Sequence, residues 1–68
     1  MRYAVIIEQA DRNYSAYVPD LPGCVATGAT YEEAEREIRD AILFHIDGLK
    51  EDGEPVPAPR SRAEYVEA

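Results

Sequence analysis

The sequence predicts an α+β domain in which a three-stranded antiparallel meander is followed by one long helix packed on the sheet and by a short C-terminal strand. Three short runs rich in β-forming residues, separated by turn residues, precede position 29. A capping box at Thr30 then opens a long run with helical periodicity. The chain has 68 residues, so we expect a single domain over residues 1–68.

The first three runs indicate the strands of the meander. Residues 2–9 are apolar on most of both faces, a pattern typical of a central strand. Polar turn residues follow at 10–13, and alternation resumes over residues 14–18, so the two runs predict a hairpin. Residues 24–28 are short and carry small side chains, which predicts a third strand on which another element packs closely.

The corner between the second and third runs contains two prolines and a glycine. Pro19 and Pro22 fix their own φ and lack an N–H, which excludes a helix or a central strand. Gly23 is expected to take the positive φ that closes the turn. We expect these three residues to be structural. Asp20 is the one charged group of the corner, and we favour a cap of its own turn over a contact with a partner.

The helix has a defined start and end in the sequence. In the capping box, the Thr30 hydroxyl accepts from the Glu33 N–H while the Glu33 carboxylate reaches back to the Thr30 N–H. Asp52-Gly53 is a typical stop. Opposite charges four residues apart predict two ion pairs, Glu32/Arg36 and Glu35/Arg39. The face predicted to lie on the sheet comprises Tyr31, Ala34, Ile38, Ala41, Ile42, His45 and Leu49.

The segment after the helix is predicted to be extended. Three prolines at alternate positions make residues 53–60 a stiff tether, roughly polyproline-like. Residues 62–67 are predicted to add a short edge strand centred on Tyr65 and Val66.

Apolar residues outside the predicted sheet contact suggest self-association. Leu43 and Phe44 point away from the sheet-facing side of the helix, so a monomer leaves both in water. We therefore expect a homo-oligomer, a dimer or a tetramer, with Leu43, Phe44, Tyr65 and Val66 at the interface. One form of it exchanges the C-terminal strand, because the stiff tether over residues 53–60 is extended enough to reach a neighbour. Two alternatives stay open: single exposed apolar residues are common, and the C-terminal segment could fold back over these two.

The composition limits the partners and the compartment. Seven basic and fourteen acidic residues give a formal charge of −7, which argues against a grip on a phosphate backbone. The helix and its exit hold nine acidic and three basic residues, a field that suits a basic partner, although it also serves solubility. A single cysteine excludes an internal disulfide. No segment is typical of a membrane span or a signal peptide, so a cytoplasmic location is expected.

An ordered set of residues along nearly the whole chain resembles the HicB family of type II antitoxins. These residues are Tyr17-Val18-Pro19-Asp20-Leu21-Pro22-Gly23-Cys24, Gly28-Ala29-Thr30, Glu33-Ala34, Ala41-Ile42 and Asp52-Gly53-Glu54-Pro55-Val56-Pro57. The resemblance implies a β-β-β-α-β domain with a partial ribonuclease H-like fold. It also implies a partner, a small basic ribonuclease toxin of the HicA type, which is neutralised by steric masking. Acidic candidates for contact with such a toxin are Asp20, Glu32, Glu33, Glu37 and Asp40.

The chain departs from many members of that family at its C-terminus. Those members carry a helix-turn-helix or ribbon-helix-helix module that binds operator DNA, and a chain ending at Ala68 leaves no room for one. We therefore expect no direct contact with nucleic acid. An orphan regulatory or scaffold domain without a toxin is the alternative function.

Catalytic chemistry is not indicated by the residues. The clustered carboxylates that hold magnesium in active ribonuclease H-like enzymes are not evident, since Glu8 alone lies on the first strand. A metal-dependent nuclease is therefore the least favoured alternative. His45 and Cys24 are interpreted as packed side chains rather than a base and a nucleophile. The sequence predicts a non-enzyme without a cofactor.

Overall fold

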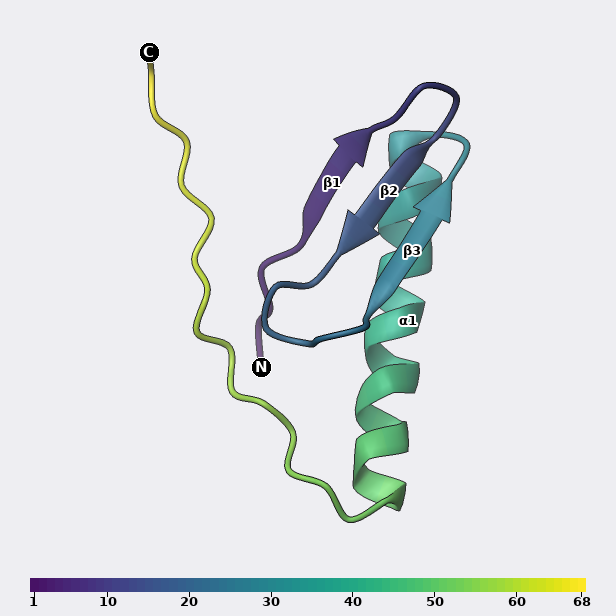
Figure 1. The fold of residues 1–68 in the computed structure, drawn as a ribbon, viewed down its shortest axis with the longest axis vertical. Helices are drawn as coiled ribbons and strands as arrows, with labels where there is room; N and C mark the ends of the chain where they lie inside the picture. Colours follow the sequence, from purple (N-terminus) through teal and green to yellow (C-terminus); the bar gives the residue numbers. More distant parts are fainter.

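The structure confirms the predicted meander and helix. The computed structural model describes all 68 residues. Three strands, β1 (Ile6–Gln9), β2 (Tyr14–Tyr17) and β3 (Val25–Gly28), precede one helix, α1 (Tyr31–Glu51). The strands form an antiparallel sheet in the order β1-β2-β3, and α1 covers one face of it (Figure 1). The helix lies closest to β3 and farthest from β1.

The strand register sorts the side chains onto two faces. Ala16 lies opposite Ile7 of β1 and Ala26 of β3, and this row faces the helix. The neighbouring row, Ile6, Tyr17 and Val25, faces away from it. The alternation expected for each run is therefore the one observed.

The position of β1 corrects one expectation. Its apolar pattern on both faces predicted a central strand, but β1 lies at the edge of the sheet. The strand is also shorter than predicted, since it begins at Ile6, although Tyr3 and Val5 before it still pack against the core. A central position needs a neighbour on each side, and no backbone hydrogen bond joins the outer edge of β1 to any other segment.

The proline corner folds as two consecutive turns. The Leu21 N–H donates to the Val18 carbonyl (3.1 Å), and the Cys24 N–H donates to the Leu21 carbonyl (3.0 Å). Gly23 has a φ of 83°, as predicted, so the second turn with Pro22 before it is of type II. A third bond, from the Val18 N–H to the Cys24 carbonyl (3.2 Å), closes the corner at its base.

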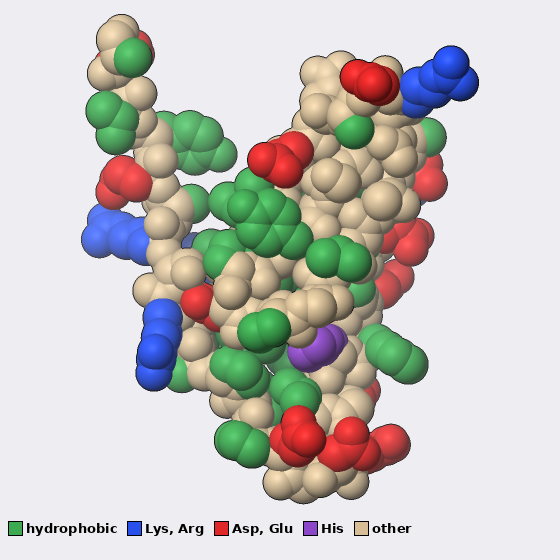
Figure 2. All heavy atoms as spheres, viewed as in Figure 1, with side chains coloured by type: hydrophobic (Ala, Val, Ile, Leu, Met, Phe, Trp, Pro, Cys, Tyr) green, Lys and Arg blue, Asp and Glu red, His purple; other side chains and the backbone are tan.

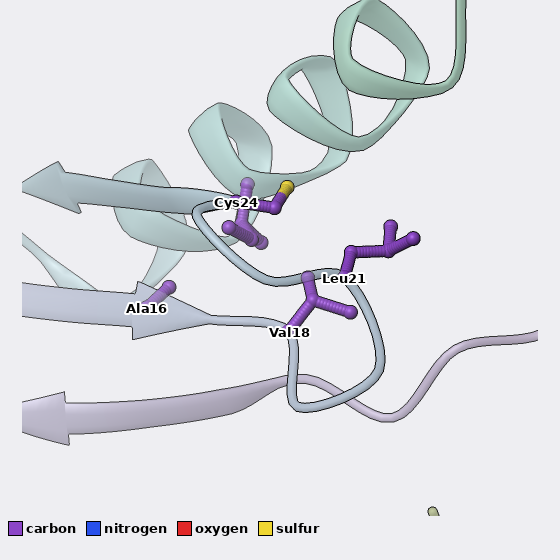
Figure 3. Close-up of a cluster of buried hydrophobic side chains, with 5 residues drawn as sticks. Ala16, Val18, Leu21 and Cys24 are labelled. Carbon is purple, nitrogen blue, oxygen red and sulfur yellow. The ribbon is translucent and has the colours of Figure 1, made fainter. Parts of the chain in front are cut away.

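This corner also supplies much of the hydrophobic core. The cluster of buried side chains contains Val18, Leu21 and Cys24 from the corner together with Ala16 of β2 and Ile38 of α1. The labelled corner side chains point in toward the space between the sheet and the helix (Figure 3). The loop is therefore held by burial as well as by its turns, as expected for a small domain with few residues to bury.

A close approach between β3 and α1 explains the small residues of the third strand. A Cβ added at Gly28 would lie 2.8 Å from the carbonyl carbon of Glu33 and 2.9 Å from the Cα of Ala34. Real Cβ atoms do not come this close to backbone, so only glycine allows the helix to start where it does. The predicted close packing on residues 24–28 is confirmed at this position.

The ends of α1 follow the sequence signals. The Thr30 hydroxyl caps the helix by accepting from the Glu33 N–H (3.1 Å), while the reciprocal bond of the capping box is absent. At the other end, Gly53 (φ 69°) donates to the Lys50 carbonyl and Glu54 donates to the Leu49 carbonyl, which is a Schellman motif. The sheet-facing side differs from the prediction in that Ile46 packs against the core, whereas Tyr31 is 48% exposed and Leu49 lies outside the packed cluster.

Residues 54–68, here called the C-terminal arm, run back along the body as an extended chain (Figure 1). The predicted strand over residues 62–67 is absent, and the side chains of Tyr65 and Val66 are exposed. An edge strand needs backbone partners and burial, and this stretch has two sizeable apolar side chains and no backbone hydrogen bond to β1. The expectation of a C-terminal strand is therefore wrong for the single chain.

Candidate protein-binding surface

The outer face of α1 carries a straight row of acidic side chains. The row also contains Phe44, and its members in chain order are Glu33, Glu37, Asp40, Phe44, Asp47 and Glu51. Successive members are four, three, four, three and four residues apart. This spacing places all six on one side of a helix, opposite the buried Ile38. We call this row, including Phe44, the acidic stripe. Acidic side chains are visible along the margin of the molecule that α1 forms in Figure 2.

Two large apolar side chains interrupt this charged surface. Phe44 is 83% exposed in the middle of the acidic stripe, and Leu43 beside it is 65% exposed. Both were expected to lie off the sheet, and the structure places them there. A solvated phenylalanine surrounded by carboxylates has the composition of an interface centre with a charged rim.

Little on the helix neutralises the charge of the acidic stripe. Of the two predicted ion pairs, Glu35–Arg39 is present at 3.4 Å, with Arg39 largely exposed and Glu35 half-buried. The Glu32–Arg36 pair does not form, since no contact within 4.0 Å joins them. No member of the stripe is in a salt bridge, so its field is directed outward into solvent.

Asp20 binds the C-terminal arm rather than its own turn. Its Oδ2 accepts from the backbone N–H groups of Arg60 and Ser61, both at 2.8 Å, and its Oδ1 accepts from the Ser61 hydroxyl at 2.8 Å. The expected cap of a local turn is therefore wrong, although the role is still structural. We call these three bonds the Asp20 clamp. The Tyr3 hydroxyl, which donates to the Pro57 carbonyl, provides a second attachment for the arm.

The electrostatics of the Asp20 clamp follow from its donors. Hydrogen bonds from the Ser61 and Arg60 N–H groups lower the pKa of Asp20 below its ordinary value, because they stabilise the charged carboxylate. The carboxylate is thus ionised at neutral pH and fully engaged within the chain. Asp20 is for this reason the least available of the five acidic residues proposed to contact a toxin.

The candidate catalytic side chains are placed as follows. Cys24 is buried, and burial raises the pKa of its thiol, as expected for a packed side chain. His45 is half-buried. Glu8 is exposed, and no three His, Cys, Asp or Glu side chains lie close enough together to hold a metal ion. No helix is sufficiently long and apolar to cross a membrane.

The family model of the HicB-like antitoxin of bacterial toxin–antitoxin systems matches residues 3–68 of this chain. The chain belongs to the HicB-like antitoxin family. The match covers the three strands, the helix and the C-terminal arm.

Individual relatives agree with this assignment. The chain is 39% identical to an uncharacterised 14.9 kDa protein of Haemophilus phage HP1, over 97% of this chain and 50% of that protein. It is 34% identical to antitoxin HicB 2 of Photorhabdus laumondii, over 98% of this chain and 49% of that antitoxin. The chain therefore spans about half the length of these two relatives.

A solved structure supports the fold of the HicB-like domain. A chain of the HicA3 and HicB3 toxin–antitoxin complex matches with a TM-score of 0.76 at 28% identity, over 88% of this chain and 70% of that chain. The three strands and the helix are thus the arrangement that a toxin–antitoxin complex also contains.

The acidic residues predicted from the sequence lie in three places. Glu33, Glu37 and Asp40 belong to the acidic stripe, and Glu32 is exposed beside it. Asp20 lies in the corner, away from the helix. Asp47 and Glu51 were not among the predicted contacts, although their three- and four-residue spacing from Phe44 would have placed them on the same face.

Proposed function

We propose that this HicB-like chain neutralises a small basic toxin of the HicA type by covering the surface that the toxin uses to bind and cleave RNA. The acidic stripe on α1 carries the proposal. Its carboxylates face solvent without cationic neighbours in salt bridges, and Phe44 lies in their midst. Masking of this kind is steric and needs no chemistry from the antitoxin.

The arrangement of the stripe suits a basic partner. A one-sided negative field accelerates the encounter with a positively charged protein and loses this effect as salt rises. A central aromatic residue that becomes buried contributes much of the binding free energy, while the charged rim gives specificity. Basic side chains of the toxin would pair with Glu37, Asp40 and Asp47, and an apolar depression would receive Phe44.

The same stripe disfavours a second copy of this chain. Two stripes meeting about a twofold axis would bring like charges together, and such contacts cost binding free energy. We therefore assign Leu43 and Phe44 to the toxin rather than to the self-association that the sequence suggested. We further propose that the chain forms a homo-oligomer through its other exposed apolar pair, Tyr65 and Val66.

The test of the antitoxin function uses a HicA-family toxin from the same genome and a messenger RNA substrate. We expect one equivalent of this chain to stop cleavage, and calorimetry to show a complex that weakens as salt rises. Cleavage that continues unchanged at equimolar antitoxin, with no complex in calorimetry, contradicts the proposal and favours the orphan regulatory domain.

Variants locate the surface. We expect the double variant Glu37→Lys, Asp40→Lys to weaken toxin binding by about a hundredfold, since two rim charges are reversed. The matched control, Asp11→Lys, Glu54→Lys, changes the net charge equally at exposed positions outside α1 and should weaken binding by less than about fivefold. Equal losses in the two variants would show a general charge effect and not a defined surface.

A further inference from the structure

The outer edge of β1 and the last residues of the C-terminal arm face each other without pairing. The arm passes along the open edge of the sheet (Figure 1), yet no bond between backbone groups joins residues 55–68 to the rest of the chain. Alternate residues of an edge strand direct their N–H and C=O groups outward, where only water or another strand can satisfy them. Two extended segments thus stand side by side, each with free backbone groups.

Two adjoining hollows lie between the arm and the residues at and before β1, and together we call them the slot. One hollow of about 470 Å³ lies between residues 2–4 and residues 61–63. It shares Arg2 and Tyr3 with a second hollow of about 480 Å³ that reaches under the helix. Figure 2 shows the arm standing away from the body along its last residues. Seven of the ten residues that line the second hollow are hydrophobic, among them Val5, Ile7 and Tyr65, and the other three are Arg2, Glu35 and Arg39.

The arm is attached on its near side and free beyond it. The Tyr3 hydroxyl bonds to Pro57, and the Asp20 clamp holds Arg60 and Ser61. After Ser61 the side chains are all exposed, and Tyr65 and Val66 are 95% and 83% exposed. The attachments therefore hold the arm against Tyr3 and Asp20 as far as Ser61, and they leave residues 62–68 extended and without backbone partners.

The chain directions of β1 and the arm indicate which segment can fill the slot. The arm runs in the same direction as β1 of its own chain (Figure 1). A twofold axis perpendicular to the sheet reverses direction, so the arm of a second copy would run antiparallel to this β1. Placed in the slot, that arm would pair antiparallel with β1 on one side and with the resident arm on the other. All pairs in the resulting sheet are antiparallel, as they are within each chain.

We propose that residues 62–68 of a second copy occupy the slot between β1 and the arm, so that two chains exchange their C-terminal strands and join their sheets into one. This inference rests on the self-association proposed above and names the surface that produces it. Tyr65 of the second copy is the large side chain available for the apolar hollow beside Val5 and Ile7. The slot and the arm both carry mixed charges, so the contact avoids the like-charge repulsion of two acidic stripes.

The exchange also accounts for the composition of β1. The strand and the residues before it are apolar on both faces, a pattern that suits a strand with a neighbour on each side. In the single chain β1 has one neighbour. In the exchanged pair it has two, and the exposed apolar residues of the arm become buried.

Sedimentation equilibrium on three chains tests the proposal. The wild-type chain, a Tyr65→Asp, Val66→Asp variant and a Leu43→Asp, Phe44→Asp variant are compared at equal concentration. All four positions are exposed in the single chain, so neither variant should unfold it. We expect an assembly of at least twice the 7.6 kDa chain mass for the wild type and the helix variant. The arm variant should dissociate about a hundredfold more readily.

Isotope-filtered NMR on a mixture of labelled and unlabelled wild-type chains detects the contact between the arm of one chain and β1 of another. We expect cross-peaks between the Tyr65 ring of one chain and the methyl groups of Val5 or Ile7 of another. An assembly that lacks these cross-peaks, or that the arm variant leaves intact, overturns the exchange while self-association stands. A wild-type chain that stays monomeric at high micromolar concentration overturns both.

Discussion

Replacing Gly28 by alanine tests the closest contact between the sheet and the helix. The added Cβ would lie 2.8 Å from the Glu33 carbonyl carbon and 2.9 Å from the Ala34 Cα, and it would contact the Ala34 nitrogen even more closely. All three atoms are backbone at the first turn of α1. They cannot rotate away as a side chain can, so the helix start must shift from β3.

The expected cost follows from this geometry. Overpacking of a well-packed site typically costs about 1 to 3 kcal/mol, and a clash with backbone belongs at the upper end. Alanine also lowers the conformational entropy of the unfolded chain, which offsets about 0.4 to 1 kcal/mol of this loss in stability. A net loss of about 2 kcal/mol remains. A domain of this size has a free energy of unfolding of only about 3 to 10 kcal/mol, so the loss is a large fraction of it.

The measurement is urea and thermal unfolding followed by far-ultraviolet circular dichroism. A loss of about 2 kcal/mol should lower the Tm of a small domain by about 8 to 16 °C. Gly48→Ala is the matched control, because Gly48 lies within α1 and a Cβ added there would meet nothing within 4 Å. That substitution should stabilise the chain by about 0.5 to 1 kcal/mol through helix propensity.

The two glycines should thus move stability in opposite directions. If Gly28→Ala leaves the free energy of unfolding within about 0.5 kcal/mol of wild type, the close approach of β3 and α1 is not as described. If both alanines destabilise equally, the effect comes from glycine replacement in general and the argument from contact fails.

Four further predictions concern the Asp20 clamp and the core. Asp20→Asn should speed amide hydrogen exchange at Arg60 and Ser61 in NMR and leave toxin affinity unchanged, since the clamp binds only the arm. Because the folded chain lowers the pKa of Asp20, the clamp is complete above about pH 4 and is lost as the pH falls through the lowered pKa. If the Arg60 and Ser61 amides are as protected from hydrogen exchange at about pH 2 as at neutral pH, this prediction fails. Cys24 should react with a thiol reagent only after unfolding, because burial raises its pKa, and rapid labelling of the native chain would refute its packed position. Ile38→Ala should cost about 2 to 5 kcal/mol in urea unfolding, and a cost below about 1 kcal/mol would show that the site is not tightly packed.

Local patterns were sufficient for the elements of this fold. The alternation of β1 to β3, the Thr30 cap and the Asp52-Gly53 stop act over a few residues, and the structure has each where it was expected. The positive φ of Gly23 is a similar case, since a proline followed by glycine in a tight corner leaves few other conformations.

The failed predictions concern contacts between distant residues. Asp20 and Ser61 are 41 positions apart, and no local pattern indicates that the corner would bind the arm. Whether residues 62–67 form a strand depends on a partner for their backbone, which short-range propensity does not supply. For the same reason the apolar pattern of β1 predicted two neighbouring strands, whereas β1 has one in the single chain.

The distribution of the core along the chain has a consequence for how the protein folds. All the buried apolar side chains lie between Ala16 and Ile38, so the loops that close the core are short, and short loops favour rapid closure. Such a core can assemble rapidly, before the last part of α1 and the arm have emerged from the ribosome. The arm contributes nothing to this nucleus and docks afterwards. Because it docks last onto a finished body, neighbouring copies could trade arms without unfolding.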